Sequence, residues 1–151
     1  MTTPNADDGG LRVNWATVVR AALSGLVIII PIVIFTEILD ANVDNFSSSR
    51  WVFLPFVLIL FAYAAAGYAG GRLAPWAPYT HGILASLGSF LTWLLFRVVE
   101  RLVRGAHIGF GPRAVMTNAM FAAGLGLFGA AIAGRAPELL REDRDPPPEP
   151  A

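Results

Sequence analysis

The chain has 151 residues, of which 55% are hydrophobic and only 15% are charged, whereas soluble domains are about a quarter charged. Its formal net charge is zero, which excludes the basic field typical of proteins that bind nucleic acid. It contains no cysteine, so disulfides, iron–sulfur clusters, thiol catalysis and cysteine-bound zinc are excluded as well.

Four long apolar stretches follow one another and predict an all-α membrane protein with four transmembrane helices. The hydrocarbon core of a bilayer requires roughly 20 apolar helical residues and offers no water to an unpaired backbone. The stretches cover about residues 15–39, 51–73, 79–103 and 114–134. A transmembrane domain over 15–135 therefore lies between a polar N-terminal tail, 1–14, and a charged, proline-rich tail, 136–151, which we expect to be disordered.

Local signals predict where some of these helices begin and end. Asn14 precedes the first stretch and is a suitable N-cap, and Thr80 is expected to cap the third helix in the same way. Gly105 follows the third stretch and is expected to end that helix, because glycine tolerates the left-handed conformation found there.

An internal repeat relates the two halves of the chain. Residues 17–72 align without gaps with residues 80–135, and Glu37 matches Glu100 at the end of the first helix of each half. An arginine precedes the second helix of each half, and a Gly-Arg pair closes it. The pattern predicts two duplicated helical hairpins; the alternative is the composition that all membrane helices share.

Small residues recur at every fourth position in the second and fourth stretches. Such stripes let helix backbones approach closely, and close packing stabilises helix association in lipid. We expect the two helices to pack against each other or against another protomer, although glycine and alanine are common in all membrane helices. The packing residues are Ala62, Ala66, Gly67, Gly70, Gly71, Ala122, Gly126, Ala130 and Gly134. The GxGxxG pattern over 124–129 lacks the strand that a dinucleotide site requires, so we assign its glycines to packing.

Few polar residues lie within the stretches, and their roles stay open at this point. The set Ser86, Ser89, Thr92 and Asn118 either bonds between helices, which is the default expectation, or lines a polar path.

Charged residues gather where the first and third stretches end. Glu37 and Glu100, with Arg97 and Arg101 nearby, either form interfacial ion pairs or are solvated separately among the headgroups; we expect the second.

The two histidines give no sign of a catalytic or metal site. His81 lies at the membrane edge and is expected to be an interfacial cap, and His107 has no partner at ligand spacing. We therefore expect no catalytic residue, no metal site and no cofactor.

The stretch Ala69–Arg72 and the pair His81–Gly82 carry a resemblance to a known group. The chain resembles uncharacterised four-span membrane proteins of bacteria, actinobacterial in type, in which one span ends in Gly-x-x-Ala-Gly-Arg and the next begins with His-Gly. The turn between them departs from the group's more basic turn. The resemblance implies a membrane location and four spans, and it implies no known activity.

The expected function is that of a non-enzymatic accessory protein, scaffold or complex subunit that acts through small-residue helix packing. Its partners would be the lipid bilayer and a second copy or another membrane protein, with no nucleic acid. The alternative is a small oligomeric transporter or channel.

The arginine counts of the two sides do not decide orientation. The first loop region is acidic and the third is basic, and both lie on the same membrane face. Their attraction can keep basic residues on an outer face, so we expect a multi-pass cell-membrane protein with both termini cytoplasmic.

Overall fold

The computed structural model describes residues 13–105 and 111–142, and within these ranges the chain is helical with no strand. Its elements are α1 (Trp15–Asn42), the short 3₁₀ turns η1 (Phe46–Ser48) and η2 (Arg50–Val52), α2 (Phe53–Leu73), α3 (Pro78–Val103) and α4 (Pro112–Glu142). Each of the four α-helices in these ranges is long and apolar enough to cross a membrane. The predicted fold class is therefore confirmed, and the protein is a multi-pass membrane protein.

Two of the three predicted helix ends are confirmed. The Oδ1 of Asn14 accepts the backbone N–H of Thr17 at 3.2 Å, as an N-cap does. Gly105 has a φ of 65° directly after α3 ends. The prediction that Thr80 caps α3 is wrong, because the helix begins at Pro78; proline is favoured there, since its φ is preset and the first turn needs no N–H from it.

The C-terminal helix is longer than predicted. α4 continues through Pro137 to Glu142, eight residues past Gly134, so the expectation of disorder is wrong for residues 136–142. Residues 138–142 are Glu, Leu, Leu, Arg and Glu, which are strong helix formers, and extending an existing helix requires no new nucleus. The rest of the predicted tails, 1–12 and 143–151, and His107 lie outside the described residues.

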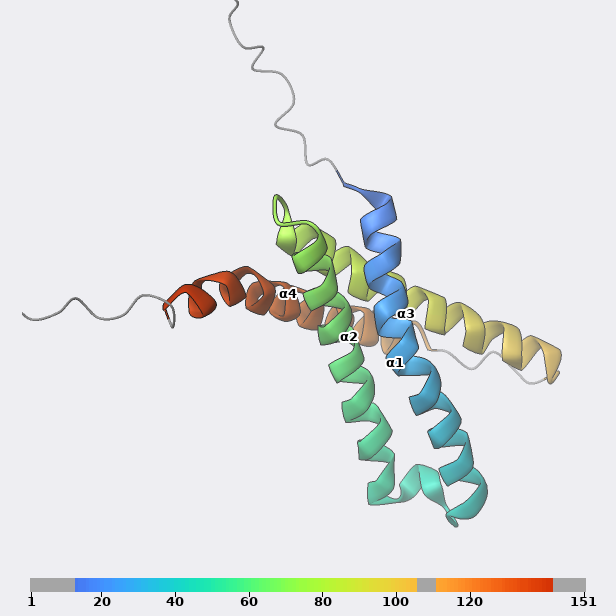
Figure 1. Ribbon diagram of the computed structural model, residues 1–151. Helices are drawn as coiled ribbons and strands as arrows, with labels where there is room; N and C mark the ends of the chain where they lie inside the picture. Colours follow the sequence, from blue (N-terminus) through green and yellow to red (C-terminus); the bar gives the residue numbers. More distant parts are fainter. Residues whose placement is uncertain (1–12, 106–110, 143–151) are drawn as a thin grey trace, which may run out of the picture.

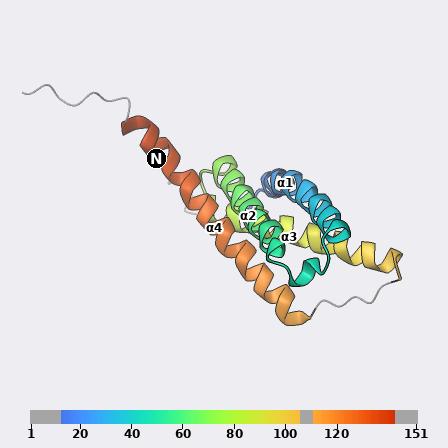
Figure 2. The same cartoon turned by 90° about the horizontal axis from the view of Figure 1, so that it is seen from below.

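The four helices form two crossed pairs. α1 and α2 run side by side and are joined through η1 and η2, and α3 and α4 cross behind them (Figure 1). Both α2 and α3 contact α1 and α4, whereas α1 and α4 do not contact each other. From below, α4 and α1 flank the molecule on opposite sides (Figure 2). One face of α4 is thus left without a neighbour inside the described chain.

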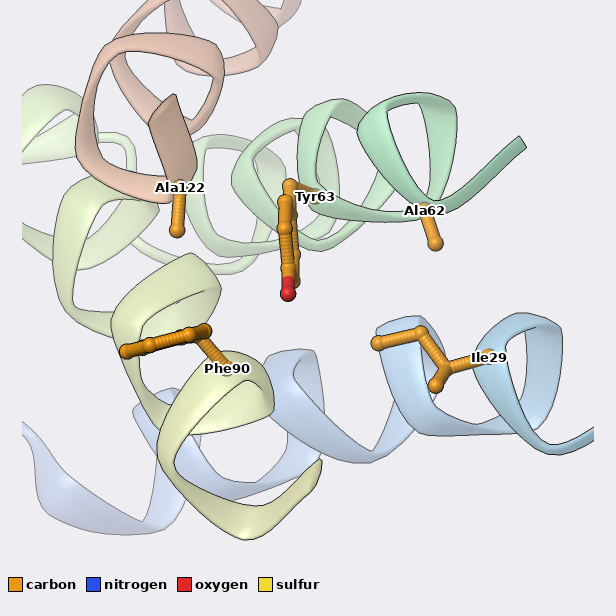
Figure 3. Close-up of a cluster of buried hydrophobic side chains, with 5 residues drawn as sticks. All are labelled: Ile29, Ala62, Tyr63, Phe90 and Ala122. Carbon is orange, nitrogen blue, oxygen red and sulfur yellow. The ribbon is translucent and has the colours of Figure 1, made fainter. Parts of the chain in front are cut away.

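The apolar core lies where the two pairs cross. Side chains from all four helices meet there, namely Ile29, Ala62, Tyr63, Phe90 and Ala122 (Figure 3). The rings of Tyr63 and Phe90 pack edge to face, with centroids 6.3 Å apart. The alanines leave room for these rings, so the crossing combines close backbones with two bulky side chains.

Candidate functional site

Glycines bring the backbones of α2 and α4 into contact along a line that we call the α2–α4 seam (Gly67, Gly71, Gly126, Gly129 and Ala130). A Cβ atom placed on Gly67 would lie 2.5 Å from the Gly126 Cα, and one on Gly71 would lie 2.9 Å from the Ala130 Cα. A Cβ atom on Gly129 would overlap the carbonyl oxygen of Ala64. These positions have no room for a larger residue, and the close approach gives the van der Waals contact that holds helices together in lipid.

The other predicted packing residues serve different neighbours. Ala62, Ala66 and Ala122 are fully buried. Ala66 faces α1, where a Cβ atom on Gly25 would lie 2.9 Å from it, and Gly70 faces the start of α3. Gly134 is exposed, and a Cβ atom there would meet nothing within 4 Å. The structure therefore gives Gly134 no packing role within the chain.

Gly82 of α3 lies where three helices meet, although it is not among the predicted packing residues. A Cβ atom on Gly82 would lie 2.6 Å from the Ala130 Cβ and 2.9 Å from the carbonyl oxygen of Gly67. The signal was present, because Gly82 and Ser86 are four residues apart and form a short small-residue stripe on α3. Three helices, not two, therefore share the tightest packing.

Two buried serines connect α3 to its neighbours. Ser86 and Ser89 are fully buried. The Ser86 Oγ donates to the carbonyl oxygen of Tyr63 in α2 at 2.5 Å, and the Ser89 Oγ donates to that of Ala22 in α1 at 2.8 Å. Such interhelical bonds contribute about 0.6 kcal/mol each.

The four residues of the predicted polar path all bond to main-chain carbonyls. Thr92 is exposed, and its hydroxyl donates to the carbonyl oxygen of Gly88 in its own helix at 2.8 Å. Asn118 donates to Ala114 in α4 at 2.9 Å. The four polar side chains thus point to separate main-chain acceptors, two of them for Ser89, because a hydroxyl or amide without water turns to the nearest carbonyl. These bonds favour a structural role for the four side chains, and the path over Ser86, Ser89, Thr92 and Asn118 stays a prediction.

His81 lies in the first turn of α3 and is fully buried. Its Nε2 lies 3.0 Å from the backbone nitrogen of Asn14, and its Nδ1 lies 2.9 Å from the carbonyl oxygen of Ala77. A backbone N–H can only donate, so Nε2 accepts and Nδ1–H donates to Ala77. Trp76 packs edge-on against the ring, with centroids 5.7 Å apart. His81 therefore does cap a helix, but the helix is α1.

Charged residues of α1 and α3 form an interfacial cluster at one end of the molecule (Glu37, Asp40, Arg97, Glu100, Arg101 and Arg104). The Arg97 Nη1 lies 2.9 Å from the Glu37 Oε1 and 3.0 Å from the Glu100 Oε2. The Arg104 Nη2 lies 3.0 Å from the Glu100 Oε1. The expectation that Glu37 and Glu100 are solvated separately is wrong, because opposite charges attract more strongly where the protein excludes part of the water. Arg101 lines the same hollow.

Comparison with known proteins identifies no relative of this chain. No family model matches it, and no curated protein and no solved structure is significantly similar to it. Any statement of function therefore rests on the residues and contacts described above.

Proposed function

We propose that this protein is a non-enzymatic membrane subunit, an accessory or scaffold protein that acts through the apolar faces of its helices. The bonding of the polar side chains within the spans supports this proposal. Ser86 and Ser89 are bonded to other helices, and Thr92 is bonded to its own. Among the described residues, no group of three or more histidines and carboxylates could hold a metal ion. These side chains hold helices and offer no reactive atom to a substrate.

The observation that carries the proposal is the outer face of α4 (Met116, Met120, Gly124 and Phe128). These residues follow one another at intervals of four, and the exposed fractions of the three large ones are 68%, 67% and 59%. A Cβ atom on Gly124 would meet nothing within 4 Å, and a hollow of about 450 Å³ opens beside it. A small residue between large ones forms a groove into which the side-chain ridge of another helix can pack.

A single cysteine tests this face cleanly, because the chain has none of its own. In the Met120→Cys variant, a benzophenone attached to the new thiol is expected to crosslink to one defined protein, either a second copy or another membrane protein. The matched control is Val27→Cys on α1, whose native side chain is 71% exposed but lies on the opposite flank. That position should yield lipid adducts only.

Two results would contradict the proposed face. Identical adduct patterns at residues 27 and 120 would mean that both positions face only bulk lipid. The same conclusion would follow if Gly124→Leu, which fills the groove and whose Cβ meets nothing within 4 Å, left the Met120→Cys adduct unchanged.

We infer that both termini are cytoplasmic. Arginines are usually found on the cytoplasmic side, so those of the third loop region need a reason to lie outside. The ion pair between Arg97 and Glu37 supplies one, because it ties a basic residue to the acidic first loop region on the same membrane face. Ser48 is exposed between α1 and α2. In intact cells, the Ser48→Cys variant should react with a membrane-impermeant maleimide; reaction only after lysis would reverse the topology.

A further inference from the structure

An apolar groove runs along the line where α1 and α3 lie together. Three hollows of about 430, 310 and 480 Å³ follow one another along it. The first and second share Leu26 and Thr92, and the second and third share Val33, Ile34 and Phe96. Consecutive hollows that share walls form one continuous surface, and its lining is almost entirely aliphatic and aromatic.

The groove ends at the interfacial cluster. Glu37, Glu100 and Arg104 line both its last apolar hollow and a polar hollow of about 410 Å³. The 23 residues from Trp15 to Glu37 extend over about 33 Å of helix, close to the roughly 30 Å of a hydrocarbon core. The cluster therefore lies at headgroup depth when the groove lies at acyl-chain depth.

The cluster carries both signs of charge in equal number, with three carboxylates and three guanidinium groups. The Arg104 side chain is 65% exposed and is bonded to Glu100 through one nitrogen, so other donors of its guanidinium point to the surroundings. The Glu37 side chain is 44% exposed, and Asp40 is exposed beside it. A purely anionic headgroup would meet three carboxylates here, whereas a zwitterionic headgroup finds a partner for each of its charges.

We propose that this groove binds one phospholipid whose zwitterionic headgroup carries a primary ammonium, that is, a phosphatidylethanolamine. An acyl chain lies in the α1–α3 groove, and the phosphate accepts hydrogen bonds from Arg104. The ammonium donates to Glu37 and Asp40, which a choline headgroup cannot do because its nitrogen has no proton.

The experiment measures which lipid stays with the protein. The full chain is reconstituted into nanodiscs containing equal amounts of phosphatidylethanolamine, phosphatidylglycerol and phosphatidylcholine, and is then released into mild detergent for native mass spectrometry. One bound phosphatidylethanolamine per chain is expected, enriched about tenfold over the other two lipids, which corresponds to about 1.4 kcal/mol. Equal retention of the three lipids would overturn the proposal.

Two pairs of variants separate the headgroup contacts from the apolar groove. The double variant Asp40→Asn with Arg104→Gln should abolish the enrichment. Asp44→Asn with Arg113→Gln, the same changes on the same membrane face outside the groove, should preserve it. Ile34→Trp, which fills the groove, should lower total retained lipid, whereas Ile132→Trp on α4 should not. Equal effects within either pair would show that the groove does not select the lipid.

Discussion

Replacing Gly126 with alanine is expected to lower the free energy of unfolding by about 1–3 kcal/mol, the usual cost of overpacking a close contact. The added Cβ would lie 2.7 Å from the carbonyl oxygen of Gly82 and 2.7 Å from the Ser86 Oγ, so the contact between α4 and α3 would have to open. Gly124→Ala is the matched control on the same helix. A Cβ there meets nothing within 4 Å, and alanine is the better helix former by up to about 1 kcal/mol.

Reversible unfolding in mixed micelles, followed by circular dichroism, measures both variants under the same conditions. The stability changes of the two variants should differ in sign, or at least by more than about 1 kcal/mol. If Gly126→Ala keeps its stability and instead changes only the oligomeric state, then the glycine contact lies between chains, as the sequence also allowed.

The second large effect is expected at His81. Replacing it with leucine keeps much of the volume but removes the acceptor of the part-buried Asn14 N–H, and a hydrogen bond of this kind contributes about 0.5–1.5 kcal/mol. The Ala77 carbonyl keeps its bond from the backbone nitrogen of residue 81, so the damage is confined to the start of α1. The amide of Asn14 should therefore exchange with solvent faster in this variant, beyond the loss of overall stability.

The control is Tyr79→Leu, two residues earlier on α3, where the native side chain is 53% exposed. A change at this position should shift stability by no more than about 0.5 kcal/mol. Unaltered exchange at Asn14 in His81→Leu would show that the histidine does not hold the start of α1.

The sequence predicts the spans well because the hydrocarbon core offers no water to the backbone, so its N–H and C=O groups must bond within each segment. Four apolar stretches of sufficient length must be helices, and Asn14 and Gly105 act locally, so their roles can be read from neighbours in the chain. The end of α4 was missed because residues 136–151 were interpreted as a charged, proline-rich tail with too little apolar surface to fold, although leucine, glutamate and arginine favour a helix.

The contacts within the candidate site could be predicted only in part. A stripe of small residues marks a face but not its neighbour, which depends on how each helix is rotated and crossed. Thus Gly67 meets α4 while Gly70, less than a turn away, meets α3. His81 binds a backbone N–H 67 residues away, which no local pattern indicates. For the two serines the sequence favours interhelical bonds over a polar path, but it does not indicate which carbonyls accept them.

The central claim is that the α2–α4 seam closes within one chain, and a disulfide across it is the most direct test. A Cβ on Gly71 would lie 3.0 Å from the Ala133 Cβ, slightly closer than the 3.5–4.5 Å of a disulfide, so a small opening of the seam accommodates the bond. Oxidation of the Gly71→Cys, Ala133→Cys double variant in membranes should give a monomer whose intact mass is lower by the mass of two hydrogen atoms. A covalent dimer, or two thiols that stay free, would contradict this account.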